Sequence, residues 1–182
     1  MSYDIYLLSP EDADEPESAV ERLAEPAGPG DAAQEVRKKR LAEALVAENP
    51  ALEIFEFDHQ AIAAELKTTV EEARRTYSHI EVNAPKTGIQ ITIFANAATV
   101  TVPYWHAGSA AEPVFAEIQR ATALLASQGG YRIYDPQIEQ VVDDLSDILD
   151  EVIWAYAGVV GSVPDLGSAG HAPAKKPWWK FW

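Results

Sequence analysis

The sequence predicts a two-layer α+β sandwich of ferredoxin-like type, in which an antiparallel meander is flanked by parallel strands and helices cover one face. Two periodicities and the chain length support this class. Strand-like alternation occupies residues 3–8, 80–104 and 131–134. Helical spacing of apolar residues occupies residues 32–48, 59–77, 113–128 and 137–157. With 182 residues, 47% of them hydrophobic, the chain is long enough for one core, and we expect a single domain over residues 1–157.

The chain begins with a strand and an acidic loop. Residues 3–8 alternate and are followed by Ser9-Pro10, which predicts a strand that ends there. Residues 10–30 are rich in Asp, Glu, Pro and Gly, and we expect a loop with one helical turn near Ala19 to Ala24.

Two helices are predicted next. Asp31 is a good N-cap for a helix over residues 32–48, which Asn49-Pro50 ends. Residues 52–57 are compatible with a short strand, but Asp58 also caps a further helix over residues 59–77.

The middle of the chain predicts a three-stranded meander over residues 80–104, with one apolar and one threonine-rich face. A helix over 113–128, a strand over 131–134 and a helix over 137–157 follow. Because crossover connections return a parallel strand, we expect strand 3–8, the last meander strand and strand 131–134 to run the same way.

Composition excludes several classes of function. The chain has 29 Asp and Glu against 14 Lys and Arg, a net charge of −15, and no cysteine. Disulfide scaffolds, thiolate zinc sites and cysteine nucleophiles are therefore excluded. The negative field repels nucleic acid, so we expect no nucleic-acid partner. No apolar run is long enough to span a membrane, which predicts a soluble cytoplasmic protein.

Metal and cofactor sites have little support in the sequence. The four histidines are scattered, and phosphate-loop and dinucleotide fingerprints are absent, so we expect no metal and no cofactor. One basic tetrad, Arg37-Lys38-Lys39-Arg40, lies in a predicted helix that also carries acids. The tetrad is either a solvated helix face or an anion site.

The turns after two predicted strands gather titratable groups. Tyr104, Trp105 and His106 follow the meander, and Asp135 follows strand 131–134. If these turns share one sheet edge with the acidic loop from Glu11, His106, Asp135 and Tyr104 could form an acid–base site, with Asp135 orienting His106. The alternative is structural, with Asp135 capping the final helix and His106 bonding its own turn.

The predicted final helix has an acidic outer face. Its acids include Asp143, Asp144, Asp147, Asp150 and Glu151, and no Lys or Arg occurs between Arg132 and Lys175. Like charges at helical spacing repel each other, and acids near the carboxyl end of a helix oppose its dipole. These unfavourable terms suggest a basic protein partner. The alternative is a merely soluble acidic surface.

The composition changes after residue 157. Residues 158–174 are rich in Gly, Ser, Ala and Pro, which predicts a flexible linker, and residues 175–182 form a basic aromatic tail. Its tryptophans Trp178, Trp179 and Trp182 are candidates for partner binding. The tail could instead dock on its own acidic body or touch a membrane interface, but it is too short for stable insertion.

Three motifs carry a resemblance to known proteins: the tyrosine-aspartate start Met1-Ser2-Tyr3-Asp4, the turn Pro103-Tyr104-Trp105-His106 and the turn Tyr134-Asp135-Pro136-Gln137. With them, the chain resembles a loosely defined family of small, mostly uncharacterised bacterial proteins, several of which look like immunity proteins that neutralise toxins. The resemblance implies a non-enzymatic protein that binds a basic toxin or partner. The alternative is a small enzyme that uses His106 and Asp135. The sequence leaves the oligomeric state open.

Overall fold

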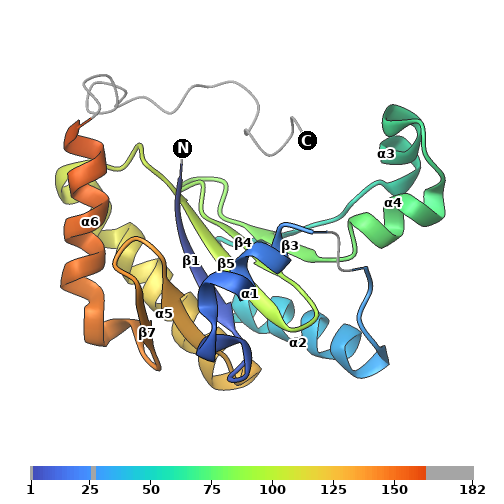
Figure 1. The fold of residues 1–182 in the computed structure, drawn as a ribbon. Helices are drawn as coiled ribbons and strands as arrows, with labels where there is room; N and C mark the ends of the chain where they lie inside the picture. Colours follow the sequence, from blue (N-terminus) through green and yellow to red (C-terminus); the bar gives the residue numbers. More distant parts are fainter. Residues whose placement is uncertain (1, 26–27, 163–182) are drawn as a thin grey trace.

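The structure, a computed structural model, describes residues 2–25 and 28–162 and confirms the α+β class (Figure 1). Within these residues, seven strands form one antiparallel sheet: β1 (Ser2–Leu8), β2 (Glu53–Phe55), β3 (Ile80–Asn83), β4 (Gln90–Ile93), β5 (Ala97–Pro103), β6 (Arg132–Asp135) and β7 (Gln140–Val142). The α-helices are α1 (Pro16–Leu23), α2 (Ala32–Glu48), α3 (His59–Leu66), α4 (Val70–Thr76), α5 (Ala111–Gly129) and α6 (Leu149–Ser162). Three short 3₁₀ turns accompany them: η1 (Asp12–Asp14), η2 (Gly108–Ala110) and η3 (Leu145–Ile148).

The strand order is β2-β3-β4-β5-β1-β6-β7, so β1 lies inside the sheet between β5 and β6. Both neighbours run antiparallel to it: Ser2 lies opposite Pro103 of β5, and Tyr6 lies opposite Tyr134 of β6. β5 and β6 therefore run in the same direction, as expected, but the expectation that β1 runs parallel to them is wrong. The finer, ferredoxin-like classification stays a prediction.

The error in strand direction comes from β2. This three-residue strand pairs with β3, so the meander has four strands instead of three. Each antiparallel pairing reverses the strand direction, and the additional pairing of β2 with β3, which are joined through α3 and α4, makes β5 antiparallel to β1. As a result, the turns after β5 and β6 lie beside the beginning of β1, whereas the acidic loop from Glu11 follows its other end.

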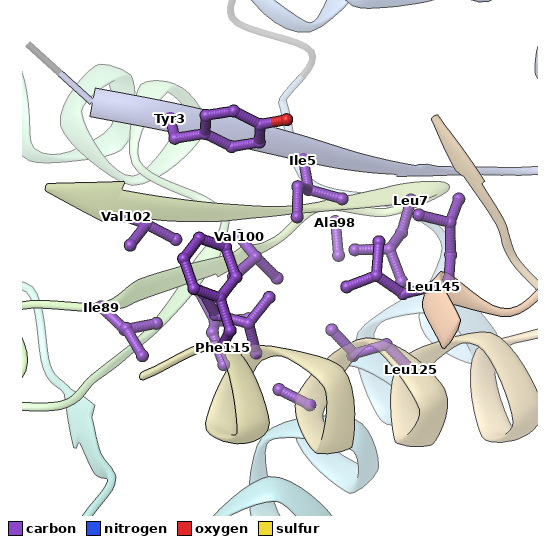
Figure 2. Close-up of a cluster of buried hydrophobic side chains, with 14 of the residues drawn as sticks. Tyr3, Ile5, Leu7, Ile89, Ala98, Val100, Val102, Phe115, Leu125 and Leu145 are labelled. Atoms are coloured by element: carbon purple, nitrogen blue, oxygen red, sulfur yellow. The ribbon is translucent and has the colours of Figure 1, made fainter. Parts of the chain in front are cut away.

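The main core lies between the sheet and helices α2, α5 and α6. Tyr3, Ile5 and Leu7 of β1 point to this side, where they meet α5 residues such as Phe115 and Leu125 (Figure 2). The sequence predicted helices on one face of the sheet only, but the opposite face is also covered in part by a helix. A second cluster packs α1 against Leu8, Ala97 and Tyr134 of the sheet, because the acidic segment forms a real helix that begins at Pro16.

Two predicted helices have different bounds in the structure. The helix predicted over 59–77 is interrupted at Lys67, which has a φ of 54°, and Thr69 caps α4 by accepting from Glu72 N at 3.1 Å. In Figure 1 the resulting pair, α3 and α4, extends beyond the β2 side of the sheet.

The helix predicted over 137–157 is wrong in its first half. Glu139 has a φ of 56° and turns the chain into β7, followed by η3, and only residues 149–162 form the helix α6. Residues 163–174 of the predicted linker and the tail 175–182, with Trp178, Trp179 and Trp182, lie outside the described residues.

Candidate functional site

The predicted acid–base residues come to one sheet edge but are not assembled as a pair. Asp135 is fully buried, and its Oδ2 accepts a hydrogen bond of 2.6 Å from the Tyr3 hydroxyl. Its Oδ1 accepts from the Gln137 backbone N–H at 2.8 Å. This second bond shapes the turn from β6 into β7, so Asp135 neither caps a helix nor orients His106.

His106 is held by its own surroundings. Its Nε2 lies 2.7 Å from the Thr87 carbonyl oxygen, which can only accept and therefore assigns the proton to Nε2. Its backbone N–H donates to the Tyr156 hydroxyl at 3.2 Å. Burial lowers the pKa of His106, so the imidazole is neutral at neutral pH.

Tyr104 belongs to a cluster of tyrosines around β1. Its ring stacks on Tyr156 of α6 with centroids 5.2 Å apart and meets Tyr3 edge-on at 6.3 Å. The Tyr156 hydroxyl donates to the Pro103 carbonyl at 2.7 Å, and burial raises the pKa of Tyr156 to about 12. Sequence reasoning missed Tyr3 and Tyr156 as members, because both fit an ordinary core pattern.

The contacts of the tyrosine cluster and Asp135 support a structural role. Burial raises the pKa values of Tyr3, Tyr104 and Asp135, and the charged form of each is disfavoured there. The hydroxyls of Tyr3 and Tyr156 already donate within the protein. The structural alternative for Asp135 and His106 thus has direct support, although the partners differ in part from those expected.

The five predicted partner-binding acids are exposed but do not form one helix face. Asp143 forms an ion pair of 2.9 Å with Arg132, and Asp144 accepts from Ser146 N at 2.8 Å to cap η3. That backbone hydrogen bond lowers the pKa of Asp144. The three remaining acids, Asp147 in η3 and Asp150 and Glu151 in the first turn of α6, have no ion pair with another described residue.

The acids of α6 lie at the opposite end of the helix from the one the sequence suggested. Asp150 and Glu151 are in its first turn, where negative charge is favoured by the helix dipole. The expected electrostatic cost at the carboxyl end is therefore absent from α6. What stands out instead is Trp154, one turn further on, which is 79% exposed.

We name this surface the α6 outer face. It consists of Asp147 and the exposed residues of α6 at three- and four-residue spacing: Asp150, Glu151, Trp154, Ala157, Gly158 and Gly161. The opposite side of α6 packs on the core through Val152, Tyr156 and Val160. The sequence contained a signal for the exposure of Trp154. Positions 152 and 156 lie on the buried side of the helix, and position 154, two residues from each, lies on the opposite side.

A groove on the other side of the molecule was missed entirely. Its cavity has a volume of about 510 Å³, and α2, β2, the start of α3, the end of α4 and the start of β3 contribute to its walls. We name it the α2–α4 groove. Five half-buried rings line it: Phe55, Phe57, His59, Tyr77 and His79. The sequence signal was the alternation of rings at 55, 57 and 59 and again at 77 and 79.

Comparisons with known proteins add no family. No family model matches the chain, no curated protein matches it, and no solved structure matches it. The resemblance to immunity proteins therefore stays a prediction.

Two absences among the described residues bear on the kind of site. In residues 2–25 and 28–162, no helix is long and apolar enough to cross a membrane. Over the same part of the chain, no group of three or more His, Asp or Glu side chains is placed to hold a metal ion.

Proposed function

We propose that the chain is an acidic, non-enzymatic protein-binding protein, of the immunity type that its motifs resemble, and that it binds a basic protein in the cytoplasm. The observation that carries the proposal is Trp154, which is 79% exposed at the centre of the α6 outer face. Tryptophan is strongly enriched among the residues that dominate interface energies. Leaving its large ring in water is unfavourable unless a partner covers it.

The charge around Trp154 supports a basic partner. Asp147, Asp150 and Glu151 flank it without a counter-ion among the described residues, and residues 133–162 contain no Lys or Arg. Unpaired acids attract a cationic surface over several ångströms and speed its encounter. Burial of the tryptophan would then slow dissociation.

The shape of the surface is also suitable. Beyond Trp154, the α6 outer face continues with Ala157, Gly158 and Gly161, which carry little or no side chain. A partner backbone can approach such a surface closely and pack against the tryptophan ring from the side. The predicted alternative, an enzyme with a His106 and Asp135 pair, has less support because these residues bond to Thr87 and Tyr3 and not to each other.

The test is co-purification at low salt from the source cells, followed by calorimetry with the purified partner. We expect Trp154→Ala to weaken binding about 30-fold, the size of a typical hot-spot loss. The double change Asp150→Lys with Glu151→Lys should slow association strongly and weaken its dependence on salt.

A matched control is available on the α1 side of the molecule. Asp14→Lys with Glu15→Lys changes the net charge equally, at two exposed residues outside the α6 outer face, and should leave binding nearly intact. A partner that binds both double variants equally, or whose association rate does not depend on salt, would contradict the proposal.

The contribution of the tail is tested separately. Binding by a chain that ends at Gly170 shows whether Trp178, Trp179 and Trp182 form a second contact.

A further inference from the structure

The four residues of the basic tetrad in α2, Arg37 to Arg40, have different contacts. Arg37 donates to the Ala95 carbonyl oxygen and lies over the Tyr131 ring. Lys38 is buried, and its Nζ lies 2.7 Å from Glu35 and donates to the Ser78 carbonyl oxygen at 2.5 Å. Arg40 donates to the Gln128 carbonyl oxygen at 3.0 Å.

Lys39 is the exception within the tetrad. It is exposed, lines the α2–α4 groove and has no ion pair with another described residue. The groove also receives Arg74 from α4, which is likewise exposed and without an ion pair in the described part of the chain. Its neighbour Arg75 is paired with Glu72 at 2.7 Å and does not line the groove. Two free cations converging on one groove are unusual in a chain with a net charge of −15.

The groove carries negative charge as well. Glu43 and Glu56 line it and form no ion pair or side-chain hydrogen bond with another described residue. Glu35 also lines it, but this carboxylate is occupied by Lys38 and by the Gly30 backbone N–H at 3.0 Å. A purely anionic ligand would face the like charges of Glu43 and Glu56, and a purely cationic ligand would face those of Lys39 and Arg74.

Aromatic rings form the remaining wall. Phe57 is the centre of the cluster, with ring centroids 5.2 Å from Phe55, 5.5 Å from Tyr77 and 4.9 Å from His79. Nε2 of His59 lies 3.2 Å from the Tyr77 carbonyl oxygen, and Nε2 of His79 lies 3.3 Å from Glu81. Because these nitrogens already have partners, the two imidazoles contribute to the wall mainly through their ring faces and edges. Such a wall favours a planar aromatic group by stacking and edge contacts.

We propose that the α2–α4 groove binds a small aromatic zwitterion, with the chemistry of an aromatic α-amino acid. The ligand ring would lie against Phe57 and Tyr77, its carboxylate would be attracted by Lys39 and Arg74, and its ammonium by Glu43 and Glu56. The volume of about 510 Å³ falls in the usual range of small-molecule sites. This site is independent of the α6 outer face, so each proposal can fail alone.

The experiment uses the full chain and three probes with the same ring: L-tryptophan, N-acetyl-L-tryptophan and L-tryptophan amide. Binding is followed by two-dimensional NMR of the ¹⁵N-labelled protein. We expect L-tryptophan to shift signals of residues 54–59 and 74–80. The acetylated and amidated probes each lose one charge, and each should bind about 5- to 10-fold more weakly, as expected for the loss of one charged contact.

Exposed variants make the test specific. Lys39→Gln and Arg74→Gln should each weaken L-tryptophan binding about 5- to 10-fold. Arg75→Gln, at the next position of α4, and Lys86→Gln, in the turn after β3, remove the same charge outside the groove and should change nothing.

Three results would overturn the proposal: equal binding of all three probes, shifts that map elsewhere, or no difference between the groove variants and their controls. The ligand group can also come from a peptide, which the blocked tripeptide acetyl-Gly-Trp-Gly-amide represents. Tighter binding of this peptide than of L-tryptophan would contradict a site for the free zwitterion.

Discussion

The hydrogen bond between Tyr3 and Asp135 gives the sharpest test of the tyrosine cluster. Both residues are fully buried, and the hydroxyl donates to Asp135 Oδ2 at 2.6 Å. Tyr3→Phe removes this bond but keeps the ring, so the contacts with Tyr104 at 6.3 Å and Tyr156 at 6.0 Å remain. The change therefore isolates the polar contribution.

The expected loss follows from the kind of bond. A hydrogen bond to a charged group contributes about 1.5–3 kcal/mol, and here the carboxylate stays buried with one donor fewer. We expect the free energy of unfolding to fall by about 2 kcal/mol, which lowers the melting temperature by about 4–8 °C in a chain of this size. Urea unfolding at pH 7 measures the first quantity and calorimetry the second.

The effect has a predictable pH dependence. Burial raises the pKa of Asp135, so this carboxyl group stabilises the fold fully below its ordinary pKa of 3.8 and progressively less as the pH rises through the folded-state value. The Tyr3 bond lowers that pKa, and removing the bond raises it further. The difference between Tyr3→Phe and the wild type should thus be largest at neutral pH and shrink towards pH 4.

Tyr104→Phe is the control for this prediction. Its ring belongs to the same cluster, but its hydroxyl forms no hydrogen bond with another described residue. We expect this variant to lose less than about 0.5 kcal/mol, as for a substitution that removes no specific contact. Equal losses for the two variants, or a pH-independent loss for Tyr3→Phe, would refute the reasoning.

Four further substitutions test other parts of the fold by urea unfolding. Asp31→Ala removes the side-chain cap of α2 and should cost about 1 kcal/mol; an unchanged midpoint would mean that the cap adds nothing. Gly88→Ala adds a Cβ 2.3 Å from the Trp105 ring at a φ of +72°, and should cost about 2 kcal/mol and shift tryptophan emission. Gly130→Ala, with a φ of +70° and open space, should cost only about 1 kcal/mol, and equal costs would exclude the ring contact as a cause. Lys38→Met keeps an apolar stem but loses the bonds of Nζ, and a loss of about 2 kcal/mol is expected; wild-type stability would show that these bonds are dispensable.

The sequence predicted the central elements well because their patterns were long. Strand β1, the meander β3 to β5 and the helices α2 and α5 lie where alternation and helical spacing placed them. The three residues of β2 gave no comparable pattern. Because each antiparallel pairing reverses the strand direction, omitting the pairing of β2 with β3 inverted the direction assigned to β1 relative to β5.

Helical spacing also misled at residues 138–145. Ile138, Val141, Val142 and Leu145 recur at three- and four-residue intervals, which fits a helix, but they belong to a turn, β7 and η3. The deciding feature was Glu139, whose positive φ breaks any helix there and is not visible in the identity of the residue.

The candidate acid–base site was predicted only in part, because strand direction could be inferred from the pattern and side-chain partners could not. The turns at Tyr104 and Asp135 do meet, because β5 and β6 run parallel to each other on either side of β1. What separates His106 from Asp135 is the set of partners that each finds, Thr87 and Tyr3, and these depend on packing across the fold. The alternating rings at residues 55–59 and 77–79 indicated aromatic side chains on one side of the chain, but the α2–α4 groove itself depends on the placement of α4 relative to α2, which no local pattern shows.

The two outermost strands of the sheet affect how copies of the chain meet in solution. Both β2 and β7 contain three residues, so an approaching chain could form only a short ladder with either one. Acids stand beside both strands, Glu53 and Glu56 at one and Asp143 and Asp144 at the other, and repel the same strand of a second copy. Short and charged edges resist strand-to-strand polymerisation. Copies of the chain should therefore not polymerise through either edge strand of the described sheet, even at high concentration.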